Sequence, residues 1–338
     1  MSNEHKVRFK GFANVWTPVL GSNALKDKPY PVMLAGEKLV LFRGAQGASA
    51  LIDRCPHRGV ALSLGRVRDG CLACPFHGWR FDGQGSVTVI PWNANTQDLQ
   101  YRTEALPTRE IGGVIWVYTA IGSTAPDLPY LATLLSKRRT SVVQERVFNT
   151  HWTRSMENAL DAPHLPFVHR RTIGFGLRKK GDGASVMNTD FTHTAYGGRI
   201  HWEVEGSDSR GDRGAIDFYA PNVMRLLFNP KEEDIPAQLM AVVPIDEHRT
   251  RMMAILPPGL TFFKFLNSII GPRLMWEDGH VVESSDPFEI PETGHDLSVK
   301  SDKATLAFRR YYDQVLRRSG IEVPGSPIAF NRSQRVNV

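Results

Sequence analysis

Two histidines and two further polar side chains lie close together between Glu157 and His169. The imidazoles are those of His164 and His169, and the same segment supplies the Asp161 carboxylate and the Asn158 amide. Neutral imidazole nitrogens bind iron, zinc or copper, and a carboxylate can orient an imidazole or complete the set of ligands. The segment therefore predicts a mononuclear metal site. The alternative is an ordinary helix end whose histidines cap carbonyl groups.

The spacing of these residues predicts a break in a helix. Asn158, Asp161 and His164 are three residues apart, so they share one face of a regular helix. His169 lies five residues after His164, which is a rotation of about 140° away from that face. The prolines before and after His164 can end or bend the helix, and we expect the resulting break to bring both imidazoles together.

A second set of metal-binding side chains lies earlier in the chain, in two short hooks. The hooks are Cys55-Pro-His57-Arg-Gly and Cys74-Pro-Phe-His77-Gly-Trp. Two thiolates and two imidazoles suit either a tetrahedral zinc ion or a Rieske centre, a [2Fe-2S] cluster with thiolates on one iron and imidazoles on the other. Zinc sites usually keep two cysteines or two histidines in one hook, whereas each hook here mixes them. The mixture favours the Rieske centre.

The remaining cysteine and the nearby arginines have less specific interpretations. Cys71 would displace a histidine if it were a ligand, so we expect it to be a buried neutral thiol. Three clustered cysteines argue against a secreted disulfide framework. The nearby arginines could form a docking surface for an acidic electron donor, or could simply be solvated. They are Arg58, Arg66, Arg68 and Arg80.

Composition and charge are those of a globular chain long enough for two domains. The chain has 338 residues, of which 41% are hydrophobic and 22% charged, and we expect no membrane span. The first residues lack the apolar core of a signal peptide, which indicates a cytoplasmic protein. The net charge of +6 is scattered along the chain, so we expect no nucleic-acid partner.

The pattern of apolar residues predicts two folding units, residues 1–125 and 126–338. Short apolar runs separated by glycines in the first unit are typical of a small antiparallel β domain. The second unit is expected to be α+β, a sheet with helices on one side. Its expected strands are 141–148, 191–196, 199–204, 215–220, 223–228, 238–244 and 249–257. Its expected helices are 131–139, 260–270 and 297–318.

A third ligand for the mononuclear metal should come from another part of the chain, because two imidazoles leave most of its coordination sphere open. The best candidate is Asp278, which follows Glu277 and is expected to open a helix. The alternative is an acidic first turn that the helix dipole favours.

Both ligand sets, in this order, resemble those of the Rieske non-haem iron oxygenases, α subunit. The resemblance extends from about residue 12 to 315 and rests on the two hooks, on the spacing of the four polar residues from Asn158 to His169, and on the pair Glu277-Asp278. The compact length and the Glu-Asp pair are similar to the homotrimeric branch. That branch includes vanillate and dicamba demethylases, the pheophorbide oxygenase group and the saxitoxin-pathway oxygenases.

The resemblance implies an all-β Rieske domain followed by a helix-grip catalytic domain around a central antiparallel sheet. It implies that Cys55, His57, Cys74 and His77 hold the [2Fe-2S] cluster, and that His164, His169 and Asp278 hold mononuclear Fe(II). Asn158 would lie beside the iron. Asp161 would accept hydrogen bonds from His164 and from a cluster histidine of a neighbouring chain in a head-to-tail homotrimer.

The resemblance also implies an enzyme, the oxygenase component of a mono- or dioxygenase system. Its electrons would come from NAD(P)H through a reductase or ferredoxin on other chains, since this chain has no Gly-rich dinucleotide fingerprint. With O₂ it would hydroxylate a bulky, largely apolar or aromatic small molecule, or, as the second interpretation, remove an O- or N-methyl group. A Rieske electron carrier without catalysis and a zinc-binding module are the remaining alternatives.

Overall fold

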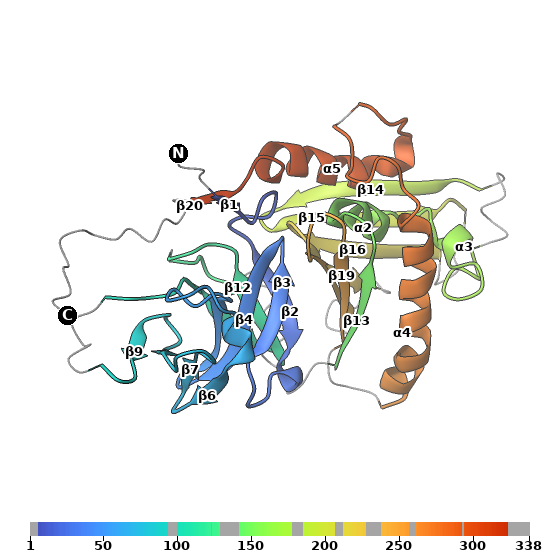
Figure 1. Ribbon diagram of the computed structural model, residues 1–338. Coiled ribbons are helices and arrows are strands. Elements are labelled where there is room, and N and C mark those ends of the chain that lie inside the picture. The colour runs from blue at the N-terminus through green and yellow to red at the C-terminus, as the bar shows by residue number, and fades with distance from the viewer. Residues whose placement is uncertain are drawn as a thin grey trace.

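The computed structural model describes residues 6–93, 100–122, 124–128, 142–177, 185–206, 212–227, 238–256, 261–292 and 294–323, with only the backbone of 6, 142, 261–269 and 323. An N-terminal unit of small sheets lies beside a C-terminal unit built on one large sheet (Figure 1). Within the described ranges, no helix combines the length and the apolar character needed to cross a bilayer.

The N-terminal unit contains three antiparallel sheets. The first has the order β10 (Ala105–Leu106), β5 (Gly47–Ile52), β4 (Glu37–Gly44) and β3 (Tyr30–Leu34). The second has β11 (Thr108–Ile111), β12 (Val114–Tyr118) and β2 (Trp16–Gly21), and the third has β6 (Arg66–Arg68), β7 (Cys71–Ala73), β8 (Arg80–Phe81) and β9 (Val87–Val89). The antiparallel β prediction is confirmed. The strands of two or three residues are too short to show an alternating pattern of their own.

The C-terminal unit is organised around a seven-stranded antiparallel sheet, as predicted. Its order is β13 (Val142–Phe148), β19 (Thr250–Leu256), β18 (Gln238–Pro244), β17 (Val223–Leu227), β16 (Arg213–Tyr219), β15 (Gly197–Val204) and β14 (Met187–Thr194). In the register, Phe218 is opposite Met224, and Met224 is opposite Met240. These side chains form an apolar row on one face of the sheet, because residues paired directly opposite each other on neighbouring strands point to the same face.

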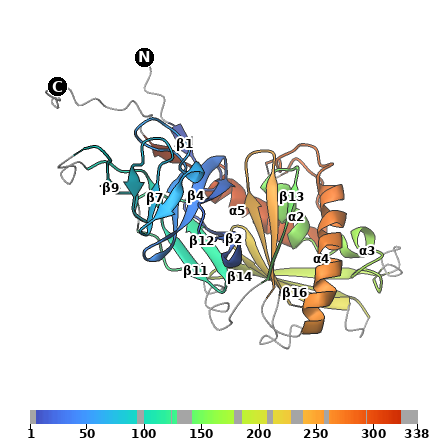
Figure 2. The same ribbon diagram turned by 60° about the horizontal axis from the view of Figure 1, so that its bottom comes forward.

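Helices cover this apolar face (Figures 1 and 2). They are α2 (Trp152–Leu160), α3 (Leu165–Val168), α4 (Thr261–Val282) and α5 (Lys303–Tyr311). A π-helical turn, Tyr312–Leu316, continues α5. Phe218 meets Phe308 of α5 edge to face, with ring centroids 6.1 Å apart. On the other face of the sheet, Arg251 donates a hydrogen bond to the Val19 carbonyl oxygen of β2, which joins the two units.

The two later helices of the C-terminal unit are present where they were predicted, but their bounds differ from the prediction. The helix expected over 260–270 and the helix expected to open at Asp278 are one helix, α4, in which Pro272 lies. Proline removes one hydrogen bond, but α4 packs against α2, β13 and β19, and that packing outweighs the loss. The final helix begins with a 3-10 turn at Lys300 rather than at 297. The expected helix 131–139 lies outside the described residues.

Candidate metal centres

The helix break that carries the two histidines lies earlier than predicted. Helix α2 ends at Leu160, and Asp161 already has extended backbone angles. The residue before Pro163 is disfavoured in the helical conformation, so the chain leaves the helix before the proline itself. The Asp161 carboxylate then accepts a hydrogen bond of 2.9 Å from the backbone N–H of His164, and α3 starts at Leu165. Asn158, Asp161 and His164 therefore do not share one helix face.

This break places both imidazoles beside Asp278, near the C-terminal end of α4. The distance from His169 Nε2 to Asp278 Oδ1 is 3.1 Å, and that from His164 Nε2 to the same oxygen is 3.6 Å. Two neighbouring ligands of an octahedral ion, each at about 2.1 Å, are about 3 Å apart. The three side chains therefore fit a facial triad on one ion, with Asp278 at a helix end rather than in the first turn.

Asn158 contacts the carboxylate of this triad. Its amide Nδ2 donates a hydrogen bond of 3.0 Å to Asp278 Oδ1. The amide thus restrains the orientation of the Asp278 carboxylate, which is 10% exposed.

Asp161 contacts His164 differently from the prediction. The His164 Nδ1 atom is 2.5 Å from the backbone carbonyl oxygen of Asp161 and 3.5 Å from its carboxylate. The ring therefore hydrogen-bonds to the carbonyl group, because the extended backbone at Asp161 turns that group towards it. The Asp161 carboxylate is 25% exposed and faces the surface in part.

A further carboxylate, that of Glu277, contacts the other imidazole. Glu277 Oε2 is 2.9 Å from His169 Nδ1 and accepts a hydrogen bond of 2.8 Å from the Thr172 hydroxyl. Its other oxygen accepts a hydrogen bond of 3.0 Å from Arg273 Nε. In the sequence, Glu277 is notable only as the neighbour of Asp278. Its role in the site could not be inferred, since the contact joins residues 108 positions apart.

The charges of the site favour a cation. Burial alone would lower the pKa of His169, but hydrogen bonds and charge from Asp278 and Glu277 outweigh burial and raise it. Burial would raise the pKa of Asp278 and of Glu277, but contact with His169 and other donors holds the pKa of both carboxyl groups below the usual range. Two buried carboxylates beside two imidazoles are a suitable donor set for a divalent metal.

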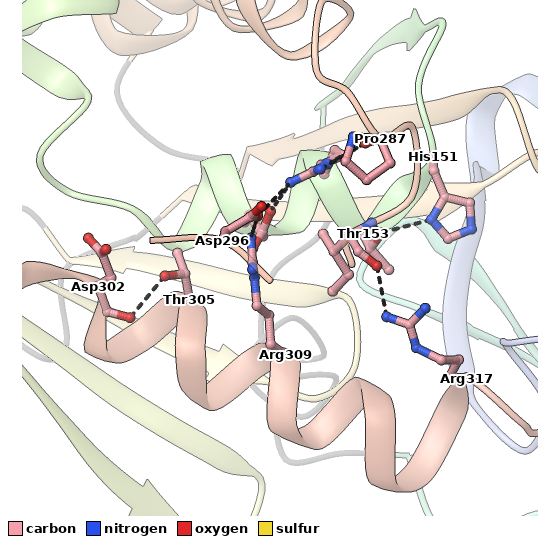
Figure 3. Close-up of polar contacts among 11 residues, drawn as sticks. His151, Thr153, Pro287, Asp296, Asp302, Thr305, Arg309 and Arg317 are labelled. Atoms are coloured by element: carbon pink, nitrogen blue, oxygen red, sulfur yellow. Dashed lines mark hydrogen bonds and ion pairs between the residues drawn. The ribbon is translucent and has the colours of Figure 1, made fainter. Parts of the chain in front are cut away.

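Helix α2 is held on its other side by a buried ion network (Figure 3). Arg309 of α5 contacts the carboxylates of Glu157 and Asp296, the latter at 2.8 Å. Arg154 of α2 is 3.1 Å from Glu157 and donates two hydrogen bonds to the Pro287 carbonyl oxygen, of 2.8 and 3.0 Å. Glu157 immediately precedes Asn158, so this network restrains the helix that carries the amide.

The two cysteine-histidine hooks adopt the same backbone turn. The first follows β5 and the second lies between β7 and β8. Gly59 donates a backbone hydrogen bond to the Cys55 carbonyl, and Gly78 donates the equivalent bond to the Cys74 carbonyl. Both glycines have positive φ values, +73° and +72°, which other residues rarely adopt. The turns bury both cysteines and expose the hook tips.

The hooks bring like side chains together in pairs. The rings of His57 and His77 are 4.7 Å apart, and the two thiols are in contact. Among the described residues, the triad of His164, His169 and Asp278 is the only trio of such side chains whose ligand atoms all lie within 4.8 Å of one another. The hooks therefore lack the closed trio that a single tetrahedral zinc would need, and the paired arrangement fits the Rieske centre.

Single atoms of the hooks also fit a cluster. The Nδ1 atom of His57 is buried and has no hydrogen-bond partner among the described residues. Burial, with a smaller contribution from Cys74, raises the pKa of the Cys55 thiol to about 11. Metal coordination would deprotonate such a thiol and satisfy the ring nitrogen.

Cys71 and the nearby arginines lie apart from this arrangement. Cys71 is only partly buried, so the prediction of a buried thiol was wrong, and the Thr88 hydroxyl contacts its sulfur at 3.6 Å. Its position in the short strand β7 leaves one side of the residue open to solvent. Arg80 pairs with Asp69 at 2.8 Å. Arg58, Arg66 and Arg68 are exposed, which fits either solvation or docking.

Two protein families match the chain. The Rieske [2Fe-2S] domain matches residues 15–106, and the vanillate O-demethylase oxygenase C-terminal domain matches residues 148–318, which is just over half of the chain. Together the two matches include all the candidate ligands.

Curated proteins similar to the chain include oxygenase subunits. The oxygenase subunit of 3-chlorobenzoate-3,4-dioxygenase from Comamonas testosteroni is 37% identical over 46% of this chain and 37% of the relative. The methylxanthine N1-demethylase NdmA from Pseudomonas putida is 24% identical over 88% of this chain and 87% of the relative. The chain spans less than half the length of the first relatives that it matches at 30% identity or more, among them the 3-chlorobenzoate-3,4-dioxygenase subunit.

Solved structures show the same fold. Pseudomonas putida NdmA with caffeine has a TM-score of 0.75 at 21% identity and covers 93% of this chain and 97% of its own. Dicamba monooxygenase bound to dicamba has a TM-score of 0.72 at 18% identity, over 91% of this chain and 98% of its own. The expected architecture, a Rieske β domain followed by a domain with a large antiparallel sheet, is confirmed.

Proposed function

The chain belongs to the Rieske oxygenase family defined by the vanillate O-demethylase oxygenase C-terminal domain, and from this premise we propose that it is the oxygenase component of a Rieske non-haem iron system. The observation that carries the proposal is the convergence of His164, His169 and Asp278 from separate elements, in a chain that also contains a Rieske domain. The proposed domains are residues 1–125, for the cluster, and 126–338, for the iron site and substrate.

The cofactors of such an enzyme are a [2Fe-2S] cluster and mononuclear Fe(II). We assign Cys55 and Cys74 to one iron of the cluster and the two hook histidines to the other. The triad would hold Fe(II) through two imidazole nitrogens and one carboxylate, leaving three adjacent coordination positions open. When bound, the iron supplies the activation of O₂ with electrons from the cluster.

The protein side chains position these parts. Asn158 donates a hydrogen bond to Asp278 Oδ1 and so orients that carboxylate. The Asp161 carbonyl group contacts His164 Nδ1, so that Nε2 of the ring faces Asp278. The overall reaction inserts one oxygen atom into a substrate C–H bond. One C–H bond and one O₂ molecule react with two electrons and two protons, and the products are a C–OH group and one water molecule. The electrons come from NAD(P)H through a reductase or ferredoxin partner.

A head-to-tail homotrimer is part of the proposal. Strands β7 and β9, near the hooks, and helix α3, beside the triad, lie at opposite ends of the molecule in both views (Figures 1 and 2). Electron transfer from the cluster of one chain to the iron site of a neighbouring chain would therefore cover a shorter distance than electron transfer within one chain. Exposed apolar side chains occur at both ends, including Phe76, 60% exposed, near the hooks and Phe167, 60% exposed, in α3. The partly exposed Asp161 carboxylate would accept a hydrogen bond from His77 of the neighbour.

The substrate that we propose is a bulky, largely apolar or aromatic small molecule. An apolar hollow of about 90 Å³ lies beside α3. Its lining is Pro163, Pro166, Phe167, Leu177, Ser185, Met187 and Val204. A pocket for a whole drug-sized molecule is several times larger, so this hollow would hold only one apolar end of the substrate.

Oxidative demethylation is the second candidate. The C-terminal family is that of vanillate O-demethylase oxygenase, and one relative matched along 88% of this chain is a methylxanthine N1-demethylase. The same insertion into an O- or N-methyl C–H bond gives a hydroxymethyl product that loses formaldehyde. Hydroxylation and demethylation thus differ in the substrate and not in the chemistry at the metal.

Metal analysis tests the proposed function first. Anaerobically purified protein should contain about three irons and two acid-labile sulfides per chain, with a Rieske EPR signal after reduction by dithionite. Two irons and two sulfides, with no third iron after addition of Fe(II), would instead favour the electron carrier without catalysis.

Substrate assays then separate the two reactions. The loaded protein, with a reductase, is incubated with aromatic compounds that carry or lack methoxy and N-methyl groups, under ¹⁸O₂. A stable hydroxyl group containing ¹⁸O indicates hydroxylation, and formaldehyde release indicates demethylation.

A further inference from the structure

We infer that Glu277 is a positioning residue of the iron site, which fixes the His169 imidazole with its Nε2 atom towards the metal. The inference rests on the proposed function in one respect, that His169 binds Fe(II). Glu277 and the ligand Asp278 are adjacent in α4, and they contact opposite nitrogens of the same ring. One short segment of helix thus defines both sides of this imidazole.

The geometry determines which nitrogen carries the proton. Neutral imidazole has one N–H donor and one acceptor nitrogen, and only the acceptor can bind a metal. Glu277 Oε2 lies 2.9 Å from Nδ1, and a carboxylate can only accept a hydrogen bond, so the proton belongs on Nδ1. The Nε2 atom also faces a carboxylate oxygen, Asp278 Oδ1 at 3.1 Å, but a metal bound between these two ligand atoms would replace that contact. Nε2 would then coordinate the metal while Nδ1 keeps its proton.

The burial of Glu277 indicates that its carboxylate is positioned for the contact with His169. The Glu277 side chain is 8% exposed and that of His169 is 3% exposed. A buried carboxylate is unfavourable unless it is paired. The third partner, Arg273, is 53% exposed, and such an exposed ion pair contributes little. The contacts with His169 and Thr172 are therefore the ones that compensate the burial of Glu277.

The two imidazoles of the triad are not equivalent. His164 Nδ1 faces a neutral carbonyl oxygen, whereas His169 Nδ1 faces a carboxylate. An anionic partner makes the imidazole a stronger donor to a metal and orients the ring more tightly. His169 should therefore depend on its partner more than His164 does. Because the Thr172 hydroxyl donates a hydrogen bond to the same oxygen of Glu277, the turn that follows His169 is also bonded to this carboxylate.

The test is Fe(II) binding by Glu277→Gln, a replacement of nearly the same shape without the charge. The mononuclear iron is removed by a mild chelator, cluster content is checked by EPR, and Fe(II) is titrated back. We expect about 10- to 100-fold weaker Fe(II) binding, with the cluster signal unchanged. Glu277→Asp, which keeps the charge, should bind more tightly than the glutamine variant. Fe(II) affinity equal to that of wild type in Glu277→Gln would overturn the inference.

Matched controls separate positioning from a general structural role. Glu283→Gln changes an exposed carboxylate just after the end of α4, which accepts a hydrogen bond from the Asn149 backbone N–H, and should leave Fe(II) affinity unchanged. Thr172→Val removes one hydrogen bond to Glu277 and should weaken Fe(II) binding by about two- to tenfold. This variant keeps the test decisive if Glu277→Gln does not fold, because wild-type affinity in Thr172→Val would then overturn the inference.

The outcome also distinguishes this inference from the proposed function. If wild-type protein takes up no third iron, the proposed function itself fails. If wild type binds Fe(II), His164→Ala does not, and Glu277→Gln binds as wild type does, only the role of Glu277 is refuted.

Discussion

Replacement of Arg309 by methionine should destabilise the C-terminal unit measurably. The Arg309 side chain is 9% exposed and contacts Glu157, which is 13% exposed, and Asp296, which is 39% exposed. Methionine fills much of the same volume but removes the charge. Among the residues that the structure describes, Glu157 would then retain Arg154, at 3.1 Å, as its one charged partner.

The expected loss is about 2–3 kcal/mol of the free energy of unfolding. Removing one partner of a buried ion pair typically costs about 3–5 kcal/mol, because the other charge stays buried. Arg154 still pairs with Glu157, which reduces this cost. The contact with Asp296 adds little, since that carboxylate can be hydrated. For a domain of this size, the loss corresponds to a decrease in Tm of about 4–12 °C.

Thermal unfolding of the cluster-loaded protein, followed by circular dichroism, measures this loss. Arg249→Met is the matched control, because Arg249 pairs with Asp246 at the surface and is 50% exposed. We expect that variant to change Tm by about 2 °C or less. An Arg309→Met protein as stable as wild type would show that the network contributes nothing and would refute the reasoning. Because Glu157 precedes Asn158, a weaker Fe(II) affinity in Arg309→Met would show that the network also supports the metal site.

Three further predictions concern other groups. His164→Ala should lose the mononuclear iron and keep the Rieske EPR signal; loss of both would show that this residue is structural. Asp161→Ala should bind both metals but turn over at least about tenfold more slowly, since it removes the proposed link to the neighbouring cluster; normal turnover would contradict that link. Burial lowers the pKa of His151 to about 4, aided by Arg317 and opposed by the charge of Glu289. Between pH 6.5 and 4 only the unfolded state binds this proton, so stability should fall with decreasing pH by up to about 3 kcal/mol. His151→Gln should reduce this dependence, and urea unfolding midpoints across that range would reveal an unchanged slope if the assignment is incorrect.

Much of the site could be predicted from the sequence because ligand chemistry depends on residue type and spacing. Cysteines and histidines in mixed hooks indicate a Rieske centre wherever the strands run, and the two histidines of the 157–169 segment are only five residues apart in the chain. The large sheet could be predicted for a similar reason. Its strands, such as Gln238–Pro244, contain short apolar runs, and the spacing of apolar residues in such runs reflects the local backbone conformation.

Other features depend on tertiary packing, which the local pattern does not contain. Gly271 and Pro272 indicate a helix break, yet α4 continues through them because it packs against α2 and the sheet. That continuity places Asp278 at a helix end and turns Glu277 towards His169. The carbonyl group, rather than the carboxylate, of Asp161 meets the His164 ring because the chain leaves α2 before the proline.

The sequence by itself therefore determined the metal chemistry, the order of the two ligand sets and the class of the fold. Only the tertiary structure decided how the imidazoles are oriented. The partner of His169 Nδ1 is 108 residues away, and it reaches the ring only when α3 and α4 have packed together. The partner of His164 Nδ1 is three residues away, but its approach depends on a backbone turn. Residue type limits which bonds can form, and packing selects among them.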